Sequence, residues 1–272
     1  MTAGNDFTVI ISTCDGYSDL WDANVKLLNK NWADRNAETF LVTDKPTDRR
    51  FEAVTVVAAG DGTEITERLR TVLPLVRTEY ILFTLDDYFL TEKISTETVR
   101  EDIAIMRKHR LDYLRLFTMT KKSLKNRKAV EVKPGIFLLD NYAGDYIVSL
   151  YAGIWRRDFM EKTLDKPLNA WQYEVALTDM ARQLNARCAD SRRGEFPLLD
   201  VIRKGKILRK AKNYFATHPI YDGTRETMRA GEERMIALRT WLREWLPRPL
   251  FRLAKKVMRR RGYTFFSDGQ QG

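Results

Sequence analysis

The chain has 272 residues, of which 44% are hydrophobic and 11% aromatic, and its formal net charge is +10. This composition excludes a disordered or fibrous chain and predicts a globular fold with a sizeable core. Two cysteines, Cys14 and Cys188, exclude a disulfide framework and a thiolate zinc site, and no apolar run reaches the roughly 20 residues that span a bilayer. We therefore expect a cytoplasmic protein with reduced thiols.

The basic excess lies at the C-terminal end. Residues 201–272 hold 18 Lys and Arg against 6 Asp and Glu, which leaves 29 against 31 for residues 1–200. Because the first 200 residues are nearly neutral, the charge predicts a partner for the tail and not for the whole fold. We expect a main domain over residues 1–222 and a basic, amphipathic, helical extension over residues 223–272.

Apolar runs alternate with amphipathic segments over the first 92 residues. The sequence predicts strands at residues 7–13, 39–43, 53–57 and 80–85, and helices at residues 20–32 and 64–76. Strands that alternate with helices indicate an α/β fold with a doubly wound, Rossmann-like, mostly parallel sheet.

The pattern becomes mixed over residues 93–222. A helix is predicted at residues 95–110, two strands at 136–139 and 146–150, and a helix that Asn169 caps and that runs to about residue 185. We expect this half to be built onto the first sheet.

The strand at residues 80–85 ends abruptly in two adjacent carboxylates, Asp86 and Asp87. In open α/β sheets, ligands bind just beyond the carboxyl ends of the strands. Mg²⁺ and Mn²⁺ prefer hard oxygen ligands and are usually shared with substrate phosphates. The position of the pair therefore favours a metal–phosphate site, whereas an isolated Asp-Asp more often only caps a turn.

Several segments resemble bacterial glycosyltransferases of the GT-A fold, of the kind found in surface-polysaccharide assembly. These are TVIISTCD, ERLRTVLPLVRTEYILFTLDDYFL, SLYAGIWRRDFMEKTL and NAWQYE, and the resemblance covers roughly residues 7–215. In that family an Asp-x-Asp motif holds a divalent metal, Mn²⁺ or Mg²⁺, against the diphosphate of a nucleotide-sugar. The aligned triplet here is Leu85-Asp86-Asp87, in which the last acid matches firmly and Leu replaces the first. Metal dependence is therefore left open.

The resemblance also implies a nucleotide pocket at the ends of the first two strands. Thr13 and Asp15 follow the first strand and Asp44 follows the second; turn or loop roles are the alternatives for both acids. Arg68 is the expected donor-facing residue of the helix before the fourth strand, since Arg70 lies on another helix face.

Glu174 is the expected catalytic base. It lies near the start of the helix that Asn169 caps, where the helix dipole favours an ionised carboxylate. In similar enzymes an acid near this position deprotonates the acceptor hydroxyl during inverting transfer. Asp179 is the alternative base, and Trp171 and Tyr173 are candidate surfaces for sugar stacking. A capping acid beside core aromatics is the structural alternative.

Two further residues are candidates for the diphosphate end of the site. His218 is expected either to complete a metal site with Asp86 and Asp87 or to contact the diphosphate. Lys206 belongs to a run of six Lys and Arg without an acid between residues 201 and 212. It is expected to close over the leaving diphosphate, with a solvated loop as the alternative.

The tail combines apolar residues at helical spacing with seven Lys and Arg, and no acid, between residues 248 and 261. Such a helix binds an anionic membrane interface, and packing on the main domain is the alternative. The tail's aromatic residues share the apolar face and do not alternate with the arginines, so no nucleic acid is expected. We expect a protein that is peripheral on the inner face of the membrane.

Together these features predict a glycosyltransferase, hexosyltransferase-like, inverting and metal-assisted. It would move a sugar from a nucleotide-sugar donor to a glycan or a lipid-linked acceptor. One alternative is a sugar nucleotidyltransferase, which would need a Gly-rich phosphate loop where this chain has only Gly16. The other is a non-catalytic membrane or nucleic-acid adaptor, which leaves the strand-end acids unexplained.

Overall fold

A computed structural model describes residues 6–118 and 120–245 of the chain. The chain divides into two units, Met1–Thr227 and Met228–Gly272, and each is described by itself. The first unit extends past residue 222 because Ile207 pairs with Thr227, and because Arg225 hydrogen-bonds to Asp19.

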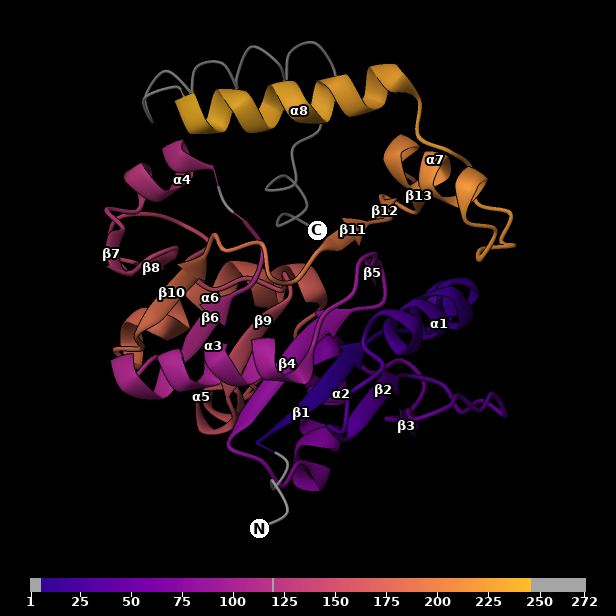
Figure 1. Cartoon of the computed structure of the whole chain (residues 1–272), viewed down its shortest axis with the longest axis horizontal. Helices are drawn as coiled ribbons and strands as arrows, with labels where there is room; N and C mark the ends of the chain where they lie inside the picture. The colour runs from indigo at the N-terminus through magenta and orange to yellow at the C-terminus, as the bar shows by residue number, and fades with distance from the viewer. Residues whose placement is uncertain (1–5, 119, 246–272) are drawn as a thin grey trace. The chain divides into compact units, whose positions relative to one another are not determined.

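The first unit is built on a nine-stranded sheet with the order β3-β2-β1-β4-β9-β6-β10-β8-β7 (Figure 1). Its first half is parallel, as predicted, and consists of β1 (Phe7–Ser12), β2 (Thr39–Thr43), β3 (Thr55–Ala58) and β4 (Tyr80–Leu85). Its second half consists of β6 (Tyr113–Arg115), β7 (Val130–Lys133), β8 (Ile136–Leu138), β9 (Gly153–Arg156) and β10 (Cys188–Ser191). There β6 and β10 pair in parallel and the other neighbours are antiparallel. The predicted α/β fold with a mixed second half is confirmed.

Helices cover both faces of this sheet. The helices α1 (Trp21–Asn31) and α3 (Thr96–His109) pack on the face that presents Val9 and Leu82. The helices α2 (Ile65–Val72), α5 (Arg157–Lys162) and α6 (Ala170–Gln183) pack on the face that presents Ile10 and Phe83. Alternate residues of β1 and β4 thus point to opposite layers, as a sheet buried on both sides requires.

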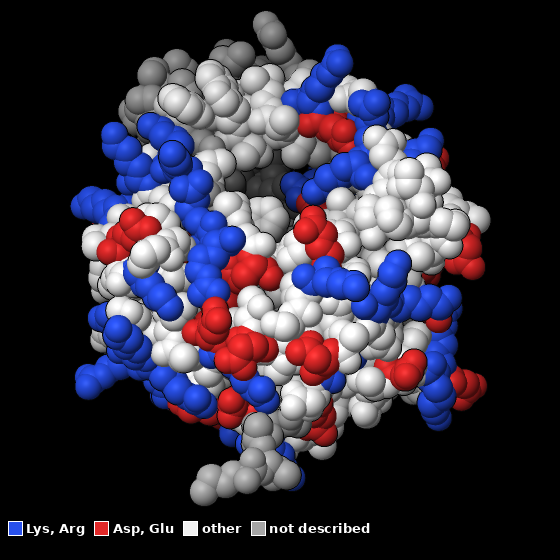
Figure 2. All heavy atoms as spheres, in the orientation of Figure 1, with Lys and Arg blue, Asp and Glu red and all other residues white. Residues whose placement is uncertain are grey.

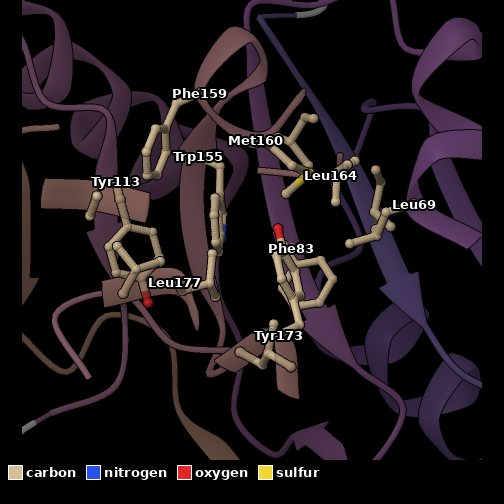
Figure 3. Packing of buried hydrophobic residues seen from close by; sticks show 14 of the residues in the cluster. Leu69, Phe83, Tyr113, Trp155, Phe159, Met160, Leu164, Tyr173 and Leu177 are labelled. Carbon is tan, nitrogen blue, oxygen red and sulfur yellow. The ribbon is translucent and has the colours of Figure 1, made fainter. Parts of the chain in front are cut away.

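Three aromatic rings on adjacent strands fill the centre of the second layer. The ring of Trp155 on β9 lies 6.2 Å from that of Phe83 on β4 and 4.8 Å from that of Tyr113 on β6. Figure 3 shows Leu177 and Tyr173 of α6 in the same cluster. These contacts join the two halves of the sheet through one core.

Shorter elements connect and flank the strands of this sheet. They are the 3₁₀ helices η1 (Asp15–Leu20) and η2 (Leu73–Leu75), the strands β5 (Tyr88–Leu90), β11 (Leu198–Asp200), β12 (Ile202–Arg203) and β13 (Lys206–Ile207), and the helices α4 (Lys121–Asn126) and α7 (Arg209–Thr217). β5 pairs antiparallel with β11, and β12 with β13.

The predicted helix starts at residues 95 and 169 are confirmed. The side chain of Ser95 accepts a hydrogen bond from the N–H of Thr98, and that of Asn169 accepts one from the N–H of Gln172. Each cap satisfies a backbone donor that the first helical turn leaves unpaired.

The strand predicted at residues 146–150 is wrong. Arg115 donates hydrogen bonds to the carbonyls of Tyr146, at 2.6 Å, and Ile147, at 2.8 Å. The hydroxyl of Thr178 accepts the N–H of Ile147 at 3.1 Å. Side chains therefore satisfy the backbone groups that a neighbouring strand would otherwise bind. The strand of this region is β9, a few residues further on.

The described part of the second unit is the helix α8 (Ala230–Trp245). Leu238, Trp241 and Trp245 are exposed, and the two indole rings stack at 6.4 Å. Most of the predicted basic tail, residues 246–272, lies outside the described residues. Within the described residues, no helix is both long and apolar enough to cross a membrane.

Candidate functional site

The parallel pairing of β1 and β4 brings Thr13 next to Asp86. Ser12 lies opposite Leu85 in this pairing, so the residues that follow the two strands meet. The hydroxyl of Thr13 donates a hydrogen bond to Oδ2 of Asp86, and the indole of Trp21 donates one to the Thr13 oxygen at 2.6 Å. The hydroxyl of Thr13, a residue predicted to bind the nucleotide, thus holds the Asp86 carboxylate.

Asp87 lies between two loops and has an unsatisfied carboxylate oxygen. Its Oδ1 is buried, and nothing in the described part of the chain donates a hydrogen bond to it. The N–H of Val201 donates to the Asp87 carbonyl at 2.9 Å, which brings Asp200 close. Arg203 donates to Oδ2 of Asp200 at 2.6 Å. The guanidinium of Arg203 is therefore paired with Asp200.

Both strand-end carboxyls resist ionisation. Burial raises the pKa of Asp86 to about 7, although the hydrogen bond from Thr13 favours the ionised form. Burial also raises the pKa of Asp87 well above its usual range, and the charges of Asp86 and Asp200 raise it further. Adjacent buried carboxylates repel each other, so both are ionised together only when a positive charge binds beside them.

These two residues fit a divalent cation. Carboxylate oxygens are the ligands that Mg²⁺ and Mn²⁺ prefer, and the orphaned Oδ1 of Asp87 is such an oxygen. Residues 6–118 and 120–245 contain no group of three or more His, Cys, Asp or Glu that could hold a metal ion. A cation at Asp86 and Asp87 would therefore take further oxygen ligands from substrate phosphates, as Mg²⁺ commonly does.

The structure does not bring His218 to this pair. His218 is exposed, and its ring stacks on Tyr214 at 4.3 Å. Its Nδ1 lies 2.9 Å from the hydroxyl of Thr217 and 3.2 Å from the Tyr214 carbonyl. The predicted trio of metal ligands is therefore not assembled.

The structure joins the two predicted acids at the ends of β1 and β2. The N–H of Asp15 donates to Oδ1 of Asp44 at 2.7 Å, and Lys45 lies 3.6 Å from the Asp15 carboxylate. Burial raises the pKa of Asp44, but hydrogen bonds from backbone N–H groups outweigh it and lower the pKa overall. Asp44 thus stays ionised and fixes the loop that follows β1.

Arg68 lies near the end of β1. Burial raises the pKa of the Cys14 thiol just after β1, and the nearby Arg68 charge partly offsets this rise. Arg68 donates to the Thr63 carbonyl, while its buried Nε finds no acceptor among the described residues. Arg70 is exposed and reaches the carbonyl of Leu164 at 3.3 Å.

Glu174 lies beside the segment that precedes β9. Its Oε1 accepts the N–H of Leu150 at 3.2 Å. Burial raises the pKa of the neighbouring Tyr151; the charge of Arg203 lowers it, and those of Glu174 and Asp200 raise it. Tyr151 therefore lies near both the predicted base and Asp200.

An aromatic column marks this region. The ring of Tyr151 lies 5.7 Å from that of Tyr88 and stacks on Phe117 at 4.5 Å. Phe117 and Tyr151 are half-buried, so they offer apolar surface beside the carboxylates. Sequence reasoning did not identify them.

Other residues with predicted roles lie as follows. Tyr173 is fully buried and its hydroxyl lies 2.6 Å from that of Thr163, so it is a core residue and not a sugar-stacking surface. Trp171, the other candidate for sugar stacking, is half-buried. Asp179, the alternative base, is exposed and pairs with Arg182 at 2.6 Å. Lys206 lies 3.7 Å from Glu226, and its hairpin brings Arg203 to the acids.

On the face that Figure 2 shows, acidic residues gather around the middle, and Lys and Arg lie along the flanks and also next to these acids. A phosphate-bearing ligand that binds among such acids needs a cation to offset their repulsion.

No protein-family model matches the chain, and no curated protein matches it either. Among solved structures it is similar to residues 1–349 of S. aureus TarS in complex with UDP-GlcNAc, at 20% identity and a TM-score of 0.49, over 74% of this chain and 60% of that one. It is similar to the mannosyltransferase PcManGT from Pyrobaculum calidifontis in complex with GDP-Man and Mn²⁺, at 14% identity and a TM-score of 0.49, over 81% and 65% of the two chains. A UDP-glucose pyrophosphorylase matches at 11% identity and a TM-score of 0.42, over 68% and 89%.

The chain thus spans less than two thirds of the length of the TarS fragment and of the mannosyltransferase. With every TM-score below 0.5, these likenesses assign neither a family nor an activity. The functional conclusion must come from the chain's own residues.

The raised pKa of the buried Asp86 carboxyl makes the stability of the protein depend on pH. Its pKa is about 7 in the folded protein against 3.8 for an ordinary aspartate, so between these values the folded form holds a proton that the unfolded form has lost. Stability therefore falls as the pH rises through this window. In EDTA, Asp86→Asn should exceed the wild type in free energy of unfolding by at least about 1 kcal/mol at about pH 8, and match it near about pH 4. Urea unfolding across this range measures the difference, and parallel pH profiles would contradict it.

Proposed function

We propose that the chain is an inverting GT-A glycosyltransferase that moves a sugar from a nucleotide-sugar to a hydroxyl of a glycan or lipid-linked acceptor. The observation that carries the proposal is the buried, unsatisfied Asp87 oxygen beside Asp86 at the carboxyl end of a parallel strand. A structural role alone would leave this repulsion uncompensated, whereas a cation shared with a diphosphate relieves it.

The donor lies across the ends of β1, β2 and β4 in this proposal. The nucleoside occupies the edge formed by Asp15 and Asp44, and Arg68 turns its charge toward the phosphates. Asp87 and Asp86 hold the divalent cation, Mn²⁺ or Mg²⁺. When bound, that cation supplies positive charge to the diphosphate as it leaves. The solved mannosyltransferase complex contains GDP-Man and Mn²⁺, and the TarS complex contains UDP-GlcNAc, so both kinds of donor are candidates.

Glu174 acts as the base for the acceptor. The acceptor oxygen forms a bond to the anomeric carbon while the bond from that carbon to the diphosphate breaks, and the acceptor proton moves to Glu174. The N–H of Leu150 donates to the Glu174 carboxylate and fixes its position. The sugars bind against the aromatic column, because their apolar faces stack on such rings.

Asp87→Asn tests the donor site by ligand-induced stabilisation. We expect a nucleotide-sugar with Mn²⁺ to raise the melting temperature of the wild type, because ligands that bind the folded state stabilise it by mass action. The carboxamide keeps the shape but removes the charge, so the variant should lose both this shift and transfer. A panel of UDP-, GDP-, dTDP- and CMP-sugars, with and without Mn²⁺, measures the effect.

The matched control is Asp165→Asn, at an exposed aspartate of the same unit. It should behave as the wild type. If Asp87→Asn kept the wild-type shift in melting temperature and the wild-type turnover, the strand-end acids would not form the donor site.

Glu174→Gln separates chemistry from binding. We expect kcat to fall by at least about 10²-fold, the usual scale for a general base, while donor affinity stays nearly unchanged. Initial rates with saturating donor, together with a donor titration, give both quantities. Asp179→Asn, on the exposed side of the same helix, is the control and should keep full activity. A collapse of donor affinity in Glu174→Gln would mark Glu174 as a binding or structural residue.

The C-terminal unit supports a peripheral position on the cytoplasmic face of an anionic membrane, near a lipid-linked acceptor. The exposed Trp241 and Trp245 of α8 offer amphipathic rings of the kind enriched at membrane interfaces. The sequence beyond α8 adds seven Lys and Arg without an acid between residues 248 and 261. Each basic group contributes about 1 kcal/mol of attraction near an anionic surface.

Deletion of residues 248–272 should release the protein from anionic vesicles and leave transfer to a short soluble acceptor intact. Flotation with phosphatidylserine vesicles measures binding. Binding of the full chain should weaken from about 0.1 M to about 1 M salt, because the Debye length falls from roughly 10 Å to about 3 Å. Neutral vesicles are the control. A full-length chain that ignores anionic vesicles at low salt would contradict the membrane role.

A further inference from the structure

Two loops lie near Asp87. The first is η1, the 3₁₀ helix after β1. Burial raises the pKa of its Tyr17, and the charges of Asp87 and Asp86 raise it further, which places the Tyr17 hydroxyl beside the acid pair. η1 follows the last paired residue of β1 and runs directly into α1.

The second loop is the hairpin of β12 and β13. It holds Arg203, whose guanidinium pairs with Asp200. The hairpin turns at Lys204 and Gly205, both with positive φ, of 53° and 73°. Backbone bonds from Val201 to Asp87 and from Leu208 to Val201, at 2.9 and 2.8 Å, anchor its base. Its turn lies beyond these anchors, between the paired residues Arg203 and Lys206.

Arg225 bonds to both loops at once. Its Nε and Nη2 donate to the two oxygens of Asp19 at 2.8 and 2.6 Å, and Nη2 also donates to the Gly16 carbonyl at 2.6 Å. Its Nη1 reaches the Gly205 carbonyl at 3.4 Å. The guanidinium lies 4.7 Å from the centre of the Tyr17 ring. One side chain therefore connects η1 with the turn of the hairpin.

A tyrosine from the same segment supports this contact. The hydroxyl of Tyr221 donates to Oδ2 of Asp19 at 2.7 Å, and its ring stacks on Phe215 at 5.1 Å. Asp19 and Arg225 are part-buried in this pairing, at 30% and 19% side-chain exposure. A bidentate, part-buried pair of this kind is stronger and more directional than an exposed ion pair.

We propose that Arg225 is a positioning residue of the donor site. It acts as a clasp that ties η1 to the β12–β13 hairpin and so fixes Tyr17 and Arg203 near Asp87. The inference rests on the proposed donor site. The clasp orders the two loops before the donor binds. Without it, donor binding must order them, and this costs binding free energy. Loss of the clasp therefore raises KM for the donor more than it lowers kcat.

The test compares Arg225→Ala with Arg49→Ala. Arg49 is a matched control, because it bonds to the Ser18 carbonyl at 2.7 Å and to Asp22 at 3.0 Å, and lies over the Trp21 ring. It thus holds the same segment of chain as Arg225 but makes no contact with the hairpin. Arg225→Lys keeps the charge and loses the bidentate geometry, so it should recover only part of the effect.

Amide hydrogen exchange gives a readout that is independent of activity. We expect exchange at residues 15–20 and 203–206 to become at least about tenfold faster in Arg225→Ala, with the rest of the sheet unchanged. Asp19→Asn should reproduce this, and the double variant should add little, because both remove one interaction. Arg49→Ala should leave exchange at residues 203–206 at its wild-type rate.

The donor KM should rise at least about tenfold in Arg225→Ala, with kcat within about threefold of the wild type. Unchanged exchange at residues 203–206 would overturn the clasp, and faster exchange with an unchanged KM would overturn its positioning role. A wild-type protein that binds no nucleotide-sugar would instead overturn the proposed function, and with it the donor role of Arg225, even where exchange shows that the two loops are tied.

Discussion

The burial of two adjacent carboxylates at the end of β4 is the constraint on which the rest of the site depends. Asp86 is held by Thr13 and, through its backbone carbonyl, by Asn24, whereas Asp87 keeps one oxygen without a donor. An arrangement of this kind costs stability in the free protein, because desolvation and mutual repulsion both disfavour the charged forms. Natural chains retain such costs mainly where a ligand relieves them.

The two halves of the sheet contribute different groups to this point. The parallel half brings Thr13, Asp44 and Arg68 to the ends of its strands, as open α/β sheets generally do. The mixed half contributes Glu174 and Tyr151, and Tyr151 lies near Asp200. Because β9 pairs with both β4 and β6, and Trp155 packs against rings on each, the two sets of groups are held in one rigid frame.

Sequence patterns predicted those elements that local physics determines. The apolar runs of β1, β2 and β4 and the caps at Ser95 and Asn169 depend on residues close in the chain. The strand expected at residues 146–150 failed because Arg115 and Thr178, distant in sequence, satisfy its backbone groups. Asp200 was missed for a similar reason, since its place follows from the pairing of β11 with β5. Ion pairs between acidic and basic residues of different loops likewise have no signature in the local sequence.

The strand order has a consequence for the synthesis of the chain. β9 lies between β4 and β6 in the sheet, although it follows both in sequence. Until residue 156 has left the ribosome, the β4 edge that carries Ile81 and Phe83 has no partner on that side. An unpaired apolar edge is a template for pairing with other chains. The nascent protein therefore passes through a stage in which one edge of β4 is unpaired, and the nine-stranded sheet is complete only after β10 has been made.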